Sequence, residues 1–231
     1  MGTFIKTAVL SVSILITSAI VARSADPEGP SLSTTTNSLP QPKAPLELVK
    51  PSIWDRAVGD GFRPTVEDLA VEAGVASGVT IFGSRQAHDL ALLSLSYGHM
   101  LGYVRGEDHW YRGNVEARLE LFGGGQYAPS VDWLIGLTPH LRYNFATGTR
   151  WIPFVDAGAG VTATGIGPPD LSGTFEFNLQ ATAGVHWFFR DDLALTGDVR
   201  YMHFSCGGLH HPNLGANDVA FMVGLSWFFG K

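Results

Sequence analysis

A histidine and a serine two positions apart, His203 and Ser205, are the residues of this chain whose types and spacing could do chemistry. They lie in a segment of alternating residues, and side chains two apart on a β-strand point to the same face. A serine hydroxyl becomes an effective nucleophile when a neighbouring imidazole takes its proton. The pair therefore suggests nucleophilic catalysis, with His203 as the base and Ser205 as the nucleophile.

The segment that carries this pair, residues 193–206, is followed after a loop by a last alternating segment, 218–230. The face that holds His203 and Ser205 is otherwise apolar, while Asp198 and Arg200 belong to the opposite face. The last segment is apolar along one whole face as well. The two strands together predict a sheet whose apolar face carries the polar pair His203 and Ser205 at one end.

Alternation persists from Glu67 to the end of the chain, and it divides into eight segments at spacings suited to hairpins. An even number of strands of about ten or more residues, each with an apolar and a polar face, is typical of transmembrane β-barrels. The sequence predicts an all-β fold, an eight-stranded antiparallel transmembrane β-barrel of the bacterial outer membrane. The expected strands are 67–83, 87–103, 111–123, 131–145, 150–164, 173–189, 193–206 and 218–230.

In such a barrel the apolar face meets lipid and the polar face fills the interior, which eight strands leave just wide enough for side chains. The charged residues expected to pair inside are Glu116, Arg118, Glu120, Arg142, Glu176, Asp198 and Arg200. The aromatic residues expected to form interfacial girdles are Tyr97, Tyr103, Trp110, Tyr111, Trp133, Trp151, Trp187 and Trp227. The alternative, a soluble lipocalin-like barrel or β-sandwich, would leave this many outward Trp and Phe side chains free to aggregate.

The chain before the barrel has two expected parts. Residues 1–24, with Lys6 ahead of an apolar run and small residues at the end, are typical of a cleaved secretory signal peptide. Residues 25–66 begin with a Pro, Ser and Thr-rich stretch that is expected to be a disordered linker. They end in a lead-in where Trp54 and Phe62 could pack under the barrel, which takes up residues 67–231.

Connection lengths predict an orientation. The connections at 146–149 and 190–192 are short, whereas those at 123–130, 165–172 and 207–217 are longer. Short turns normally face the periplasm and long loops the exterior. Both chain ends are therefore expected in the periplasm, which places His203 and Ser205 on the lipid face at the depth of the outer leaflet. A polar pair in that position costs free energy and suggests function, although a histidine and serine that bond to lipid head groups fit the spacing equally well.

Composition and charge indicate which classes of binding partner to expect. The 231 residues carry a formal net charge of -6, so no basic surface for nucleic acid is expected. The single cysteine, Cys206, excludes an internal disulfide. The membrane is the partner that the alternation predicts, and the sequence gives no oligomeric state.

The stretch Y-M-H-F-S-C-G-G-L-H-H-P-N-L-G-A-N-D, residues 201–218, followed by an alternating strand that ends W-F-F, resembles the PagL lipid A 3-O-deacylase family. The likeness extends more loosely over residues 71–229, and its specific part is the H-x-S…P-N-x-G pattern. The resemblance implies an outer-membrane barrel that hydrolyses the ester-linked acyl chain at the 3 position of lipid A, with no metal or other cofactor. It assigns the base to His203 and the nucleophile to Ser205, and it implies lipid A or lipopolysaccharide as the partner.

The sequence departs from the family at two positions. The family usually has Asn after the serine, where this chain has Cys206, and the family's glutamate that orients the histidine aligns with Asn217. Asn217 shares the parity of Val219, so it projects to the same face as His203 and could accept a hydrogen bond from the imidazole. The backbone N–H groups of Cys206 and Gly207 are candidates for an oxyanion hole.

These departures favour a competing hypothesis, a non-catalytic outer-membrane barrel that binds lipopolysaccharide or serves a structural role. A small adhesin or channel is a third. His210 and His211 are candidate metal ligands by residue type. However, no carboxylate or cysteine lies at ligand spacing, and a histidine pair in a loop is usually just solvated. Cys206 is a weaker candidate nucleophile, because its parity directs its side chain inward.

Overall fold

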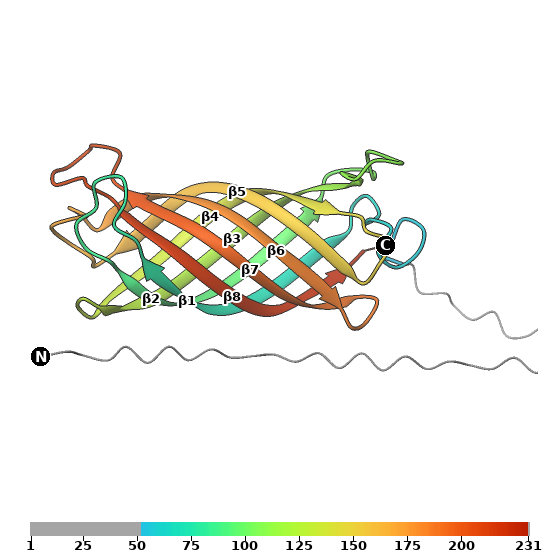
Figure 1. Ribbon diagram of the computed structural model, residues 1–231, viewed down its shortest axis with the longest axis horizontal. Coiled ribbons are helices and arrows are strands. Elements are labelled where there is room, and N and C mark those ends of the chain that lie inside the picture. The colour runs from blue at the N-terminus through green and yellow to red at the C-terminus, as the bar shows by residue number, and fades with distance from the viewer. Residues whose placement is uncertain (1–51, 231) are drawn as a thin grey trace, which may run out of the picture. The chain divides into compact units, whose positions relative to one another are not determined.

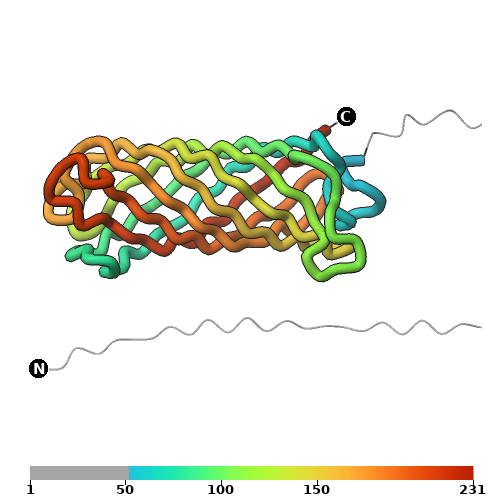
Figure 2. The backbone as a smooth tube through the Cα atoms, turned by 90° about the horizontal axis from the view of Figure 1, so that it is seen from above, coloured from blue at the N-terminus to red at the C-terminus, as the bar shows by residue number. Residues whose placement is uncertain are grey.

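Eight antiparallel strands form a closed barrel in the computed structural model, which describes residues 52–230. Each strand pairs with its neighbours in sequence, and the first pairs with the last, which closes the sheet (Figures 1 and 2). The predicted fold is confirmed. The strands are β1 (Glu67–Gly78), β2 (Asp89–Met100), β3 (Gly113–Ala128), β4 (Asp132–Phe145), β5 (Trp151–Thr164), β6 (Phe175–Phe188), β7 (Leu193–Ser205) and β8 (Ala216–Phe229).

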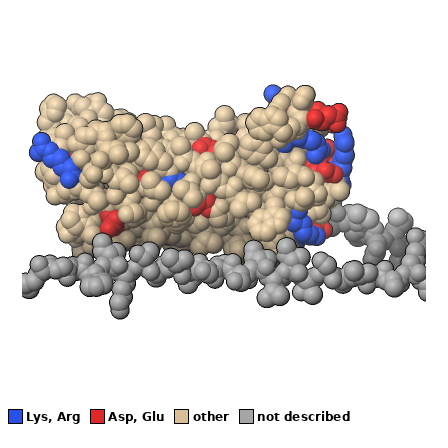
Figure 3. Space-filling view, in the orientation of Figure 1, with Lys and Arg blue, Asp and Glu red and all other residues tan. Residues whose placement is uncertain are grey.

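The outer wall of the barrel is apolar. Exposed and buried residues alternate along the strands, and the exposed set is dominated by Leu, Val, Phe and Trp. The visible side of the barrel is accordingly mostly uncharged between its two ends, with a few small patches of charged residues (Figure 3). All eight aromatic residues expected in girdles are exposed, and Trp151 stacks on Trp187 near one end with ring centroids 5.8 Å apart.

The interior holds ion pairs, as the alternation predicts. Arg118 lies 2.9 Å from a carboxylate oxygen of Asp68, Arg142 lies 2.6 Å from Asp156, and Arg200 pairs with Glu120. The charged residues predicted to face inward are all buried. Opposite charges lie beside one another there, which lowers the cost of holding them away from water. Glu176, which was also expected to pair, is buried but forms no ion pair among the described residues.

The two ends of the barrel differ. One end, called here the loop end, carries the connections 79–88, 129–131, 165–174 and 206–215. The other, called the terminus end, holds the segment before β1 and the end of β8 (Figures 1 and 2). The terminus end also carries one long connection, 101–112, beside the predicted short ones. Loop length therefore separates the ends less cleanly than expected.

The expected loop at 123–130 is wrong, because β3 continues to Ala128. Three consecutive glycines, Gly123 to Gly125, hide the strand from a reading of side-chain alternation. Gly124 pairs with Leu92 in the ladder, and a Cβ added at this glycine would lie 2.1 Å from the carbonyl oxygen of Ala91. Close approach of neighbouring backbones explains the glycine here, as it often does in strands.

The segment before β1 closes the terminus end. The sequence did not decide whether Trp54 and Phe62 pack under the barrel. Both are buried, and they pair through an isolated β-bridge. Phe62 stacks between Trp54 and Phe228, with ring centroids 4.9 Å away on each side. Its N–H and C=O both bond to the side chain of Asn114 in β3. Described residues 52–66 therefore pack as part of the barrel domain.

Replacing Phe62 with alanine should lower the free energy of unfolding by about 3–5 kcal/mol, because it empties the centre of this aromatic stack. Urea unfolding in detergent measures the change. Phe82→Ala is the matched control: Phe82 is 82% exposed at the loop end, so the same truncation should shift stability by only about 0.5 kcal/mol. Equal losses for the two variants would contradict a stabilising plug.

Two predictions, the signal peptide at 1–24 and the linker that follows it, fall on residues that lie mostly or wholly outside the described part of the chain. Between Ser52 and Gly230, no helix is long and apolar enough to cross a membrane.

Candidate active site

His203 and Asn217 lie side by side on the outer wall near the loop end, because they are register partners on β7 and β8. The Nδ1 atom of His203 is 2.8 Å from Oδ1 of Asn217. The Asn217 Nδ2 group donates to the carbonyl oxygen of Ile81 at 3.0 Å and faces Ser84 Oγ at 3.4 Å. This second set of contacts fixes which amide atom faces the imidazole, so Oδ1 accepts a hydrogen bond from Nδ1–H.

The tautomer of His203 follows from that contact. With the proton on Nδ1, the other ring nitrogen, Nε2, carries a lone pair and is the basic atom. The hydroxyl of Tyr201 also donates to Asn217 Oδ1, at 2.6 Å. Tyr201 was not singled out from the sequence, although its parity places it on the same face as His203. The three side chains form one connected group with Asn217 at its centre.

Ser205 lies one pleat beyond His203 on the same face of β7, beside Phe177 of β6. Among residues 52–230, neither Ser205 Oγ nor His203 Nε2 has a hydrogen-bond partner, so both are available to a ligand. Contacts between a catalytic base and its nucleophile are often loose before substrate binds and tighten in the complex.

The pair opens into a groove on the outer wall with a volume of about 470 Å³. Apolar side chains contribute much of its lining, and Asn213 adds an amide. Phe82, in the β1–β2 connection, stands at its edge with a left-handed backbone, φ 53°. Such a conformation is uncommon for a bulky residue. The groove is lined by Phe82, Leu179, Tyr201, His203, Ser205, Asn213, Leu214 and Gly215.

The Cys206 N–H, one of the two predicted oxyanion donors, already has a partner in the structure. It donates to Asn213 Oδ1 at 3.1 Å, and the Cys206 thiol is 3.3 Å from the same oxygen. The side chain is buried, in agreement with its inward parity, and holds the loop that follows β7. Gly207, with φ 63°, keeps an N–H without a partner in the described chain.

Asn213 is a residue that sequence reasoning missed, although it belongs to the P-N-x-G pattern. Because its Oδ1 is engaged by Cys206, its Nδ2 group is the end of the amide left to the groove. His210 and His211 are exposed, and between Ser52 and Gly230 no group of three or more His, Cys, Asp or Glu side chains could hold a metal.

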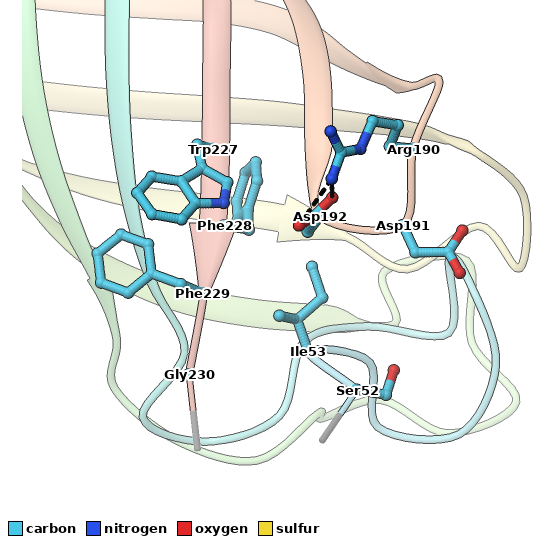
Figure 4. Close-up of a pocket in the computed structure, with 9 residues that line it drawn as sticks. All are labelled: Ser52, Ile53, Arg190, Asp191, Asp192, Trp227, Phe228, Phe229 and Gly230. Carbon is cyan, nitrogen blue, oxygen red and sulfur yellow. Dashed lines mark hydrogen bonds and ion pairs between the residues drawn. The ribbon is translucent and has the colours of Figure 1, made fainter. Parts of the chain in front are cut away.

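A second hollow lies at the terminus end of the barrel, at the opposite end of β7 from His203. Figure 4 shows the residues that line it. Trp227 and Phe229 flank it, and an Arg190–Asp192 ion pair of 3.3 Å lies at its side. None of the nine residues that line it is a histidine. Of these two hollows, the groove beside His203 is the one that combines a histidine, a serine and apolar walls.

The fold and this site define a class, outer-membrane β-barrels with a polar site on their lipid-facing wall. A model of the family described as PagL, lipid A 3-O-deacylase, matches residues 70–226. The chain belongs to this family, and it is accordingly an outer-membrane barrel of a hydrolase family that acts on lipid A.

Solved structures give the same fold. The crystal structure of the outer membrane enzyme PagL matches with a TM-score of 0.52 and 21% identity, covering 68% of this chain and 97% of that one. Neisserial surface protein A matches with a TM-score of 0.53 and 18% identity, covering 71% of this chain and 97% of that one. At these identities the likeness extends to the barrel alone. No curated protein matches the chain.

Proposed function

We propose that this protein removes an ester-linked acyl chain from lipid A, at the 3 position that gives the family its name. The observation that carries the proposal is the hydrogen bond from His203 Nδ1 to Asn217 Oδ1, which leaves Nε2 basic inside a groove that also holds Ser205. The apolar lining suits a fatty acyl chain, and the groove opens where lipid would lie.

In the proposed reaction Ser205 Oγ attacks the ester carbonyl carbon while His203 Nε2 takes the hydroxyl proton. The C–O bond to lipid A breaks, and His203 gives the proton to the departing oxygen. Water, activated by His203, then hydrolyses the acyl-serine and releases the fatty acid. The Gly207 N–H and the Asn213 Nδ2 group are the donors available to the oxyanion that forms at the carbonyl.

We place the loop end at the cell exterior and both termini in the periplasm. The site lies near the loop end of β7, so this orientation sets it at the depth of the outer leaflet, where lipid A resides. The aromatic residues at the other end, Trp151, Trp187 and Trp227, would then mark the periplasmic interface.

Mass spectrometry of lipid A after incubation with the refolded protein tests the activity. Loss of one hydroxyacyl group, with release of the free fatty acid, is the expected result. A long-chain alkyl fluorophosphonate, which reacts with activated serines, should label one peptide, and that peptide should contain Ser205. Unchanged lipid A together with an unlabelled protein would overturn the proposal.

One observation favours a second candidate function, a non-catalytic barrel that binds lipopolysaccharide. An amide at position 217 cannot stabilise an imidazolium as the family's carboxylate does, and such a change in a triad lowers kcat by roughly 10⁴-fold. Saturable binding of lipid A with no acyl release in a long incubation would select this function.

Gly215→Ala should lower kcat by about 10- to 100-fold, because a Cβ at this position would lie 2.7 Å from His203 Cε1 and push the ring. Gly208→Ala is the matched control. Both glycines have a left-handed backbone, φ 78° and 84°, but a Cβ on Gly208 meets nothing within 4 Å. Equal losses for the two variants would attribute the effect to backbone strain and not to the His203 ring.

A further inference from the structure

A single buried carboxylate joins the loops that build the site. Asp170, in the β5–β6 connection, is fully buried. Its Oδ1 accepts the Arg85 N–H and its Oδ2 accepts the Gln86 N–H, each at 2.7 Å. These two donors belong to the β1–β2 connection, so the carboxylate fastens one outer loop to another.

His88 extends this contact to the β3–β4 turn. Its Nε2 lies 3.1 Å from Asp170 Oδ2, and its Nδ1 lies 2.7 Å from Gln126 Oε1. Gln126 in turn donates through Nε2 to the carbonyl oxygen of Ser130 at 2.9 Å. The cluster lies behind the site, and its buried polar groups are satisfied by one another.

The main chain of Asp170 reaches the fourth connection. Its carbonyl oxygen accepts the N–H groups of Leu214 and Gly215, both at 3.1 Å. Gly215 packs so closely on the His203 ring that a Cβ there would overlap Cε1. The position of the imidazole therefore depends, through one residue, on where Asp170 holds this glycine.

A second route leads from the same residue to Asn217. Ser84 directly precedes Arg85, whose N–H the Asp170 carboxylate binds. The Asn217 Nδ2 group faces Ser84 Oγ at 3.4 Å and donates to the Ile81 carbonyl in the same loop. Both sides of the His203–Asn217 hydrogen bond are thus held by segments that converge on Asp170.

We propose that Asp170 is a positioning residue for the reaction, which sets the His203–Asn217 contact by fixing the 79–88 and 206–215 connections to each other. The inference rests on the proposed function for its kinetic effect, but its geometric part does not. Asp170 touches neither the groove nor the reacting atoms. Its effect should therefore fall on kcat, because a misaligned base loses rate while the apolar walls still bind the acyl chain.

The kinetic test compares Asp170→Ala, Asp170→Asn and Asn114→Ala with the wild type, all refolded in the same detergent. Asp170→Ala should lower kcat by 10- to 100-fold with KM within threefold, and Asp170→Asn, which keeps one acceptor oxygen, should recover part of the loss. Asn114 is a matched control, since it clasps Phe62 and Gly102 at the terminus end through three hydrogen bonds; its variant should keep kcat within twofold.

A spectroscopic readout needs no turnover. In the wild type, NMR of ¹⁵N-histidine-labelled protein should show the Nδ1–H tautomer of His203 with a slowly exchanging proton, and Asp170→Ala should lose that protection while Asn114→Ala keeps it. An unchanged His203 signal in Asp170→Ala overturns the positioning role even if the wild type proves inactive. A kcat loss as large in Asn114→Ala as in Asp170→Ala would do the same by pointing to general destabilisation.

Discussion

Replacing Ser205 with alanine should lower kcat for lipid A deacylation by about 10⁴- to 10⁶-fold, the largest effect expected of any single change in this chain. In the proposed reaction the variant lacks the oxygen that forms the acyl-enzyme, so that only water attack assisted by the remaining groups is left. Release of free fatty acid from lipid A, followed over several orders of magnitude in enzyme concentration, measures the residual rate.

Ser77→Ala is the matched control for this result. Ser77 is an exposed serine at the loop end of β1, where its hydroxyl lies 3.2 Å from Asp89 Oδ1. Its loss should leave kcat unchanged. The double variant His203→Ala, Ser205→Ala should be no slower than Ser205→Ala alone, because residues that act as one unit are not additive. Near-normal activity in Ser205→Ala would mean that Ser205 is not the nucleophile.

Replacing Asn217 with alanine should lower kcat by roughly 10²- to 10⁴-fold while the barrel stays folded. The substitution removes the 2.8 Å contact that holds the His203 proton on Nδ1, so the ring is free to turn and to carry the proton on Nε2. A lower kcat with little change in KM, measured with detergent-dispersed lipid A, is the expected pattern.

Tyr201→Phe separates the contribution of the Tyr201 hydrogen bond to Asn217 from that of the His203 hydrogen bond. It removes the hydroxyl that shares Asn217 Oδ1 at 2.6 Å and leaves the His203 contact in place. We expect a loss of about fivefold or less, in keeping with one hydrogen bond of about 0.5–1.5 kcal/mol. If Asn217→Ala kept more than half of the wild-type kcat, the orienting contact would have no part in catalysis.

Alternation predicted the strands because outward positions are mostly apolar, whereas many inward positions are polar or charged. Residues such as Val199 and Arg200 therefore differ sharply in type. The rule failed in β3, where Gly123 to Gly125 have no side chains to alternate. The sequence could not settle whether Trp54 and Phe62 pack under the barrel, because tertiary contacts bury them and no periodic pattern marks them.

The site residues likewise fall into those that the sequence predicted and those that it could not. Parity along β7 and β8 was enough to bring His203, Ser205 and Asn217 to one face, since ladder register follows from the strands. Asp170 and Asn213 could not be found like this, because contacts between loops leave no periodic trace. The hydrogen bond from the Cys206 N–H to Asn213 Oδ1 was not foreseen for the same reason, because it crosses a loop.

The groove lies on the outer wall of the barrel, and the interior behind it is filled by a buried apolar cluster that includes Met202 and Phe204. In the proposed orientation we expect a lipid to reach Ser205 by lateral diffusion within its own leaflet, without being lifted into water. The encounter is two-dimensional, so the rate should follow the mole fraction of substrate in the membrane and not its bulk concentration. Diluting lipid A with inert detergent at constant total lipid A should slow the reaction, in the manner of surface dilution.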